Sequence, residues 1–204
     1  FLSANDTDTP IVYEELWKKE AIMGSGGMVI MDESVCIVDM TKFFVGFLRN
    51  ESCGKCIPCR EGIQRMLEIL NSITSRPKDI TTHQTLQRFK GVMQLENLAR
   101  VIKNTSLCGL GKTAANPVLS ALKLFREEFE EHIFERNCRT GVCNNLRLYI
   151  IDTNLCTGCN ICFQKCPEQA IIGSPKTPHF IIEEKCTGCG ICHEHCKFNA
   201  INIV

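Results

Sequence analysis

The sequence predicts an α+β protein in which a four-helix bundle precedes a small unit of short strands and short helices. Apolar residues recur at helical spacing over residues 39–134, whereas residues 146–204 contain a motif that repeats after thirty positions. The chain also has 15 cysteines, most of them in close groups. Because cysteines in close groups are typical of ligand sets, we expect such sets in both parts of the fold.

Charge and composition exclude several classes of protein. Lys and Arg together number 23, as do Asp and Glu, so the chain has no basic excess with which to bind nucleic acid. It contains no apolar run of about 18 residues, and we therefore expect no membrane span. A hydrophobic content of 44% argues against a small disulfide scaffold. Reduced cysteines at ligand spacing indicate a cytoplasmic location.

Residues 1–35 are expected to be the C-terminal tail of a preceding domain. They begin with Phe1 and a polar stretch that lacks the charged start and apolar centre of a signal peptide. Glycines at 24, 26 and 27 precede the apolar run Met28–Met31. This pattern predicts a turn that leads into a strand.

The helical part, residues 36–135, is expected to contain four helices. They run from Asp39 to the next cysteine loop, from just after Cys59 to about Ile73, from Leu86 to Asn104 with an interruption near Gly91, and from Asn116 to about Ile133. Asp39 is a favourable N-cap, and Pro117 suits the first turn of the last helix. Short connections make neighbouring helices antiparallel, which predicts an up-down-up-down bundle.

Three cysteines follow the first helix in the stretch E-S-C-G-K-C-I-P-C-R-E-G, and they are Cys53, Cys56 and Cys59. A fourth thiolate is needed to complete the set. In the predicted bundle the loop after the third helix reaches the same end, and it contains Cys108. Three ligands from one loop and one distant ligand are more typical of [4Fe-4S] sites than of structural zinc sites. We therefore predict one [4Fe-4S] cluster in the bundle.

The repeat supplies eight further cysteines. Each half is predicted as strand, cysteine loop, short helix and strand. The spacing matches the bacterial C-x2-C-x2-C-x3-C-P run, in which the last cysteine of each motif ligates the other cluster. One cluster is therefore expected on Cys156, Cys159, Cys162 and Cys196, and another on Cys186, Cys189, Cys192 and Cys166. Residues 146–204 are thus predicted to form a bacterial-type 2[4Fe-4S] ferredoxin-like domain.

Three cysteines remain once the three clusters are supplied. The start of the first helix and the end of the fourth lie at the same end of the bundle, opposite the bundle cluster. We therefore predict one zinc ion held by Cys36, His132, Cys138 and Cys143. The ion would pin a hinge or linker at residues 136–145. Alternatives are a buried apolar role for Cys36, a disulfide between Cys138 and Cys143, and a solvated helix end at His132.

The cysteine motifs also carry a resemblance to a known family. E-S-C-G-K-C-x-P-C-R-E-G and S-L-C-G-L-G-x-T-A-x-N-P-V-L-S resemble the C-terminal cluster domain of the NADH-binding flavoprotein subunit of respiratory complex I. With its two-cluster tail, the chain resembles more closely the beta subunit of electron-bifurcating [FeFe] hydrogenases and related subunits of NAD(P)-dependent formate dehydrogenases and transhydrogenases. The resemblance extends from about residue 20 to the end of the sequence.

The resemblance implies an iron-sulfur segment of an NAD(P)-dependent, multi-subunit oxidoreductase. Such a segment relays single electrons between a flavin and partner redox centres and contains no catalytic residue; FMN and NAD(H) would bind upstream, outside this sequence. The implied partners are a hydrogenase-like or formate-dehydrogenase-like catalytic subunit, a small thioredoxin-like [2Fe-2S] subunit and ferredoxin. Two alternatives remain open: a zinc-stabilised interaction module without enzymatic function, and a ferredoxin-like tail that is only a static scaffold.

Overall fold

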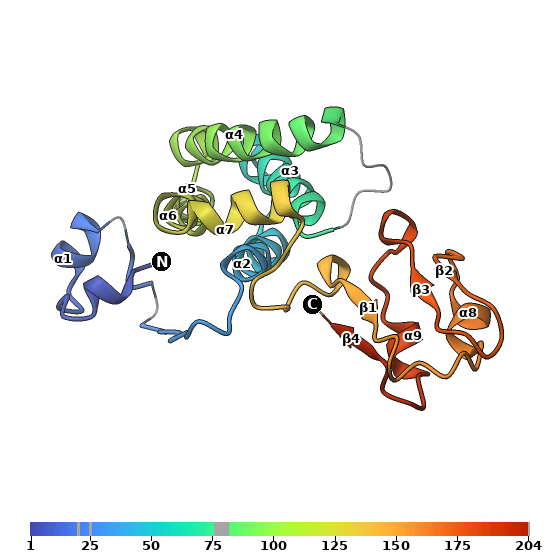
Figure 1. Ribbon diagram of the computed structural model, residues 1–204. Coiled ribbons are helices and arrows are strands. Elements are labelled where there is room, and N and C mark those ends of the chain that lie inside the picture. The colour runs from blue at the N-terminus through green and yellow to red at the C-terminus, as the bar shows by residue number, and fades with distance from the viewer. Residues whose placement is uncertain (20, 25, 76–81, 204) are drawn as a thin grey trace.

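The computed structural model describes residues 1–19, 21–24, 26–75 and 82–203, without the side chains of residues 82–85. Figure 1 shows three regions in series: an N-terminal segment around α1, a central group of helices, and a smaller unit of short strands and helices. Helices dominate the described residues, and the strands are few and short. Among the described helices, none combines the length and apolar character needed to cross a membrane.

The central region contains more helical pieces than the four expected. They are α2 (Ile37–Glu51), α3 (Ile57–Ile73), α4 (Thr82–Thr105), α5 (Gly109–Ala114), α6 (Asn116–Leu124), α7 (Arg126–Glu130) and a π-helical turn (Glu131–Glu135). The expected interruption near Gly91 is absent, because α4 runs through it. The last expected helix is broken at Phe125, where φ of −131° and ψ of 34° interrupt the helical hydrogen bonds between α6 and α7.

Two predicted helix starts were wrong. The N-cap of α2 is Cys36, whose Sγ accepts the backbone N–H of Asp39 at 3.4 Å. Asp39 instead lies in the first turn, where a carboxylate favours the helix dipole, and it pairs with Lys42 at 2.6 Å. Helix α3 begins at Ile57, two residues before Cys59, because Pro58 is compatible with a first helical turn.

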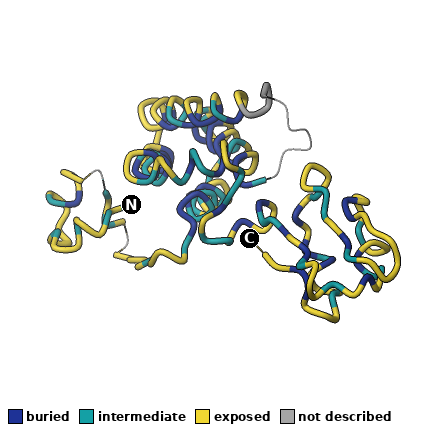
Figure 2. Tube along the Cα trace, in the orientation of Figure 1, coloured by how far each residue is buried: buried dark blue, intermediate teal, exposed yellow. Residues whose placement is uncertain are grey.

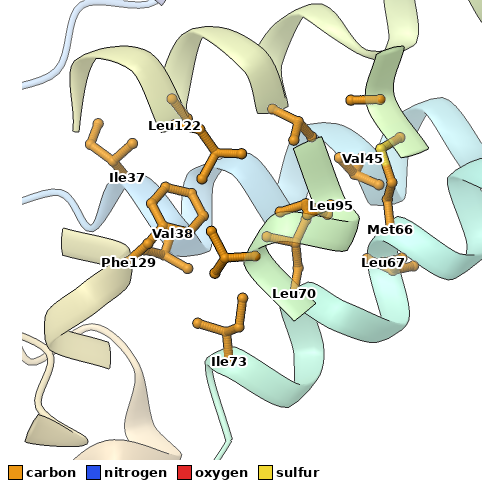
Figure 3. Close-up of a cluster of buried hydrophobic side chains, with 14 of the residues drawn as sticks. Ile37, Val38, Val45, Met66, Leu67, Leu70, Ile73, Leu95, Leu122 and Phe129 are labelled. Carbon is orange, nitrogen blue, oxygen red and sulfur yellow. The ribbon is translucent and has the colours of Figure 1, made fainter. Parts of the chain in front are cut away.

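The core of the central region lies between α2, α3, α4 and α6 (Figure 3). Side chains at helical spacing on each of these helices meet there, among them Val45, Met66, Leu70, Leu95 and Leu122. Burial of such side chains contributes about 1.5–3 kcal/mol each and outweighs the modest helix propensities of the sequence. Arg88 is buried beside them and donates to the carbonyls of Ser72, Ile73 and Ser75, so it caps the C-terminus of α3.

The N-terminal segment contains a 3-10 turn (Ala4–Asp6) and α1 (Tyr13–Lys18). The strand expected at Met28–Met31 is not formed, and that prediction was wrong. Met28, Val29 and Ile30 have no strand partner in the described structure and are 69%, 61% and 85% exposed. Figure 2 shows most of this segment as exposed. An apolar run forms a strand only where a neighbouring strand accepts its backbone hydrogen bonds.

The C-terminal unit consists of two small antiparallel sheets and two short helices. Strand β1 (Tyr149–Ile151) pairs with β4 (Ile201–Ile203), and β2 (Ile171–Ile172) pairs with β3 (Phe180–Ile181). Helices α8 (Ile161–Lys165) and α9 (Ile191–Glu194) follow the two cysteine loops. Each half of the repeat therefore has the predicted order of elements. Val204, the last residue of the expected final strand, lies outside the described residues.

Residues 136–147 join the two regions and are packed rather than free. Cys138, Cys143 and Leu146 are buried in the core of the helical region. Arg147 donates to the carbonyl of Gly141 at 2.8 Å, and Arg139 pairs with Glu131. The C-terminal unit has its own core, which among the described residues shares no side chain with the helical one. The connecting segment is thus held on the helical side.

Candidate cluster and metal sites

The first group of cysteines lies where α3 begins and α5 begins. Cys53 and Cys56 precede α3, Cys59 lies in its first turn, and Cys108 is the N-cap of α5. Helix α5 packs against α2, α3 and α4. The backbone N–H groups of Leu107 and Cys59 point at the Cys56 sulfur and hold the pKa of that thiol below its usual value. The loop that contains Cys108 therefore lies beside the first three cysteines.

The wall of this first site contains a close approach and an unpaired hydroxyl. A Cβ atom added to Gly111 would lie 2.6 Å from Oγ of Ser106 and 3.2 Å from Cβ of Cys59, so only glycine fits between them. Ser106 is 3% exposed, and its Oγ has no hydrogen-bond partner. An unpaired buried hydroxyl costs about 1–3 kcal/mol unless a bound group accepts its hydrogen bond. A sulfur-rich cluster fits this site because it supplies such acceptors.

The eight cysteines of the repeat line two separate cavities, grouped as the crossed scheme predicts. Cys156, Cys159 and Cys162 share the first cavity with Cys196 from the second motif. The second cavity is lined by Cys186, Cys189, Cys192 and, from the first motif, Cys166. Burial raises the pKa of the Cys192 thiol to about 11, and burial also raises that of Cys162. Free thiols at these positions are therefore poor anions, and a bound cation is needed to favour the thiolate.

Backbone N–H groups point at the sulfurs in both cavities. Ala170 donates to Sγ of Cys166 at 3.3 Å, and Ala200 donates to Sγ of Cys196 at 3.4 Å. Gly158, at φ of +67°, lies so close to Thr177 that an added Cβ would meet the Thr177 backbone N at 2.4 Å. Hydrogen bonds and tight backbone wrapping of this kind stabilise negative charge on a bound cluster, so both cavities fit a [4Fe-4S] group.

Two ring side chains that line these cavities, Tyr149 and His179, were not predicted from the sequence. Tyr149 lines the second cavity and His179 lines the first, and thirty positions separate them. His179 is 1% exposed, and its ring nitrogens lie 3.1 Å from the carbonyl of Thr177 and 2.9 Å from Oδ1 of Asn160. Extending the repeat from cysteines to rings would have found the pair.

The remaining predicted ligands form one compact group. The ligand atoms of Cys36, His132, Cys138 and Cys143 all lie within 4.8 Å of one another, and all four residues are buried. Nε2 of His132 is 3.3 Å from Sγ of Cys36 and 3.5 Å from Sγ of Cys143, and those two sulfurs are 3.8 Å apart. Tetrahedral zinc with Zn–S near 2.3 Å and Zn–N near 2.0–2.1 Å implies edges of about 3.8 Å for sulfur pairs and about 3.5 Å for sulfur and nitrogen. The observed distances fit such an ion.

The ring of His132 is oriented for a ligand role. Its Nδ1 lies 2.7 Å from the carbonyl oxygen of Glu128, so Nδ1 donates and Nε2 faces the sulfurs. Burial alone would lower the pKa of His132, but the thiols of Cys138 and Cys36 outweigh it and raise that pKa to about 10. Contacts with Cys143 and Cys36 hold the pKa of Cys138 far below its usual value. These shifts show that the group stabilises the Cys138 thiolate beside a positive charge.

Two of the three alternatives for this compact group find no support in the geometry, whereas the burial of Cys36 in the helical core also fits the apolar role. All 15 cysteines are free, Cys138 and Cys143 among them, so this pair forms no disulfide. His132 is fully buried rather than solvated. No other three potential ligands among the described residues gather within 4.8 Å, so the twelve predicted cluster cysteines are more widely spaced than a single ion requires.

Comparison with known protein families matches both regions of the chain. Residues 39–132 match the NADH-ubiquinone oxidoreductase-F iron-sulfur binding region, and residues 149–203 match a 4Fe-4S dicluster domain. The first match covers the helices that hold Cys53, Cys56, Cys59 and Cys108, and the second covers the duplicated unit.

Similar proteins are subunits of redox complexes. The NADP-reducing hydrogenase subunit HndC of Solidesulfovibrio fructosivorans is 46% identical over 200 residues, which are 98% of this chain and 39% of that protein. The F subunit of NADH-quinone oxidoreductase from Streptomyces coelicolor is 35% identical over 64% of this chain and 27% of that protein. The corresponding protein of Escherichia coli is 29% identical over 72% of this chain and 31% of that protein.

The chain thus spans well under half the length of these relatives. The resemblance expected from the cysteine motifs is confirmed in both of its parts. The chain combines the iron-sulfur binding region of the NADH-ubiquinone oxidoreductase F type with a 4Fe-4S dicluster domain, and its homologues include the hydrogenase subunit HndC and the F subunit of NADH-quinone oxidoreductase.

Proposed function

We propose that this chain is the electron-transfer segment of an NAD(P)-linked oxidoreductase subunit and holds three [4Fe-4S] clusters. Bound clusters of this type accept and donate single electrons. The observation that carries the proposal is the exchange of Cys196 and Cys166 between the two cavities of the repeat. That exchange is the ligand scheme of a two-cluster ferredoxin, and a fold without clusters has no need of it.

The roles of the residues follow from their placement. Cys53, Cys56, Cys59 and Cys108 would ligate the cluster of the helical region, with α2, α3, α4 and the broken helix α6–α7 as the proposed four-helix bundle. The N–H groups of Leu107, Ala170 and Ala200 would stabilise the negative charge of the sulfurs and so set the potentials. None of these residues acts as an acid or base.

The proposed domains are a tail of a preceding domain at 1–35, the iron-sulfur bundle at 36–135, a hinge at 136–145 and the ferredoxin-like domain at 146–204. The separate cores of the two larger parts support this division. Two cores joined by one short segment move relative to each other by default, so we expect the ferredoxin-like tail to swing between electron donor and acceptor. One fixed tail position in oxidised, reduced and NADH-bound particles would instead favour the static scaffold.

A zinc ion on Cys36, His132, Cys138 and Cys143 is part of the proposal. The ion would tie the start of α2 to the end of the π-helical turn and to the hinge segment, and it would give the tail a defined pivot. Elemental analysis should find about one zinc per chain beside the iron. Cys138→Ser with Cys143→Ser should remove the zinc and leave the iron unchanged. Zinc below about a tenth of an equivalent in protein never exposed to chelator would refute this site.

In the whole protein we expect FMN and NAD(H) on a part outside this sequence. Electrons would pass from the flavin to the bundle cluster and through the tail to a hydrogenase-like or formate-dehydrogenase-like subunit, a small thioredoxin-like [2Fe-2S] subunit or ferredoxin. HndC is by name a subunit of an NADP-reducing hydrogenase, and its match to 98% of this chain supports the hydrogenase-like assignment. That the complex is electron-bifurcating is a further part of the proposal, which the family resemblance alone implies.

Iron analysis of anaerobically purified full chain tests the proposal. Three [4Fe-4S] clusters require about twelve irons per chain and give broad absorbance near 400 nm. About eight irons would remove one site from the proposal. A colourless protein with zinc equal to the number of sites would favour the metal-stabilised interaction module instead. Cys196→Ser should alter the EPR signal of the cluster on Cys156, Cys159 and Cys162, and an effect confined to the other cluster would refute the crossed ligation.

A further inference from the structure

Ser106 differs from the other buried hydroxyl residues of the helical region. Thr41, Thr74 and Ser120 each donate to the carbonyl four residues earlier, at 2.7, 3.0 and 2.8 Å. The backbone N–H of Ser106 reaches Ile102 at 3.0 Å in the same way, but its hydroxyl does not. Oγ of Ser106 is buried and has no hydrogen-bond partner in the described structure.

The position of this hydroxyl relates it to the bundle cysteines. The space a Cβ would occupy at Gly111 is bordered by Oγ of Ser106 on one side and Cβ of Cys59 on the other. The next residue, Leu107, aims its N–H at the Cys56 sulfur, and Cys108 follows. Ser106 therefore lies across Gly111 from Cys59 and directly before the segment that contacts Cys56 and contains Cys108.

A second hydroxyl near the site is already paired. Oγ of Ser52 lies 3.3 Å from Sγ of Cys59 and also accepts the N–H of Gly54 at 3.3 Å. Ser106 has no such partner, so its O–H remains free to donate. A bound cluster would bring sulfur acceptors close to Ser106. A buried polar group such as this hydroxyl needs a hydrogen-bond acceptor of that kind.

We propose that the Ser106 hydroxyl donates a hydrogen bond to a sulfur of the cluster held by Cys53, Cys56, Cys59 and Cys108, and thereby raises its reduction potential. The inference rests on the proposed function of these cysteines. Reduction adds one negative charge to the cluster, and a donor at the sulfur stabilises the reduced form more than the oxidised form. The bundle cluster would then be a better electron acceptor than its cysteine ligands and backbone donors alone would make it.

The test is an EPR-monitored redox titration of the full chain, with the bundle signal identified by its loss in Cys53→Ser. Ser106→Ala should favour the oxidised form about tenfold, because a hydrogen bond to a charged group has about this effect. Tenfold corresponds to about 59 mV for a one-electron couple. Ser106→Thr, which keeps a hydroxyl, should restore the potential. Ser120→Ala, which removes a buried hydroxyl bonded within its own helix, should leave it unchanged.

The outcomes separate the two proposals. An unchanged midpoint in Ser106→Ala, with iron content and bundle signal retained, would overturn the role of Ser106 and leave the cluster assignment intact. Absence of the bundle signal and of its four irons in the unsubstituted chain would overturn the proposed function itself. If Ser106→Ala does not assemble the cluster, Ser106→Gly also lacks the hydroxyl, leaves more space beside Gly111, and decides the question by the same titration.

Discussion

The two ends of α2 carry two kinds of cysteine site. At its start, Cys36 belongs to the compact, buried group whose ligand atoms all lie within 4.8 Å of one another. The other end is about 22 Å away for a helix of 15 residues. There Cys53 and Cys108 are exposed, Cys59 is buried, and the four predicted ligands are more widely spaced. The same residue type is used at both ends. The packing thus holds the two sets of cysteines at different spacings, which suits the single ion proposed for one end and the larger cluster proposed for the other.

The largest expected effect is a loss of iron from the cysteine group that follows the C-terminal end of α2. Cys53→Ser should remove about four irons per chain and leave zinc unchanged, because serine is a poor ligand for the cluster and Cys53 does not contact the compact group. Electron flow through the bundle should fall with the iron. Iron and zinc analysis of the same sample measures both metals at once. Loss of zinc with the iron would contradict the separation of the two sites.

Cys36→Ser is the matched change at the other end of α2. Serine is a good N-cap, so the helix start should survive while one zinc ligand is lost. Zinc should fall from about one to less than about a tenth per chain, with iron unchanged. Binding to the folded state alone contributes about 4 kcal/mol when free zinc exceeds Kd a thousandfold, so Tm should also fall. A variant that keeps its zinc and its Tm would exclude Cys36 as a ligand.

Glu128 is not one of the four proposed zinc ligands, but it contacts Ile37 at the start of α2 and the ligand His132. Its carboxylate accepts the N–H of Ile37 at 3.1 Å, and its carbonyl oxygen orients His132. Glu128→Ala should lower the free energy of unfolding by about 1 kcal/mol through the lost helix cap, and it should leave zinc affinity nearly unchanged, because alanine keeps the backbone carbonyl that orients His132. Chemical denaturation and competition with a zinc indicator measure the two quantities. Glu127→Ala, at an exposed neighbour, is the control and should change neither.

The smallest effects concern the helix packing between the two ends. A Cβ at Gly62 of α3 would lie 2.6 Å from Ile102, whereas at Gly46 of α2 the nearest atom would be 3.9 Å away. Gly62→Ala should therefore destabilise the fold by about 1 kcal/mol, since overpacking outweighs helix propensity. Gly46→Ala should stabilise it by about 0.5–1 kcal/mol. Thermal unfolding of both variants should show shifts of opposite sign, and equal shifts would contradict the packing of α3 against α4.

Much of the organisation could be predicted from local patterns. The helical spacing identified the positions of α2, α3 and α4, and the thirty-residue repeat identified the order of elements in the C-terminal unit. The cysteine motifs carried the family resemblance, which the matches to residues 39–132 and 149–203 confirm. These features are encoded within a few residues of one another, so no knowledge of distant contacts is needed to recognise them.

Features that depend on distant contacts were decided by the tertiary structure. Cys36 rather than Asp39 is the N-cap of α2, and its sulfur lies at the helix start beside His132, a residue 96 positions away in the chain. Met28–Met31 formed no strand, because no backbone among the described residues pairs with it. The unpaired hydroxyl of Ser106 appears only once α4, Gly111 and Cys59 are packed together. The sequence alone determined which residues can act as ligands, whereas packing decided how far apart they are held, and the proposed choice between one ion and a cluster rests on that spacing.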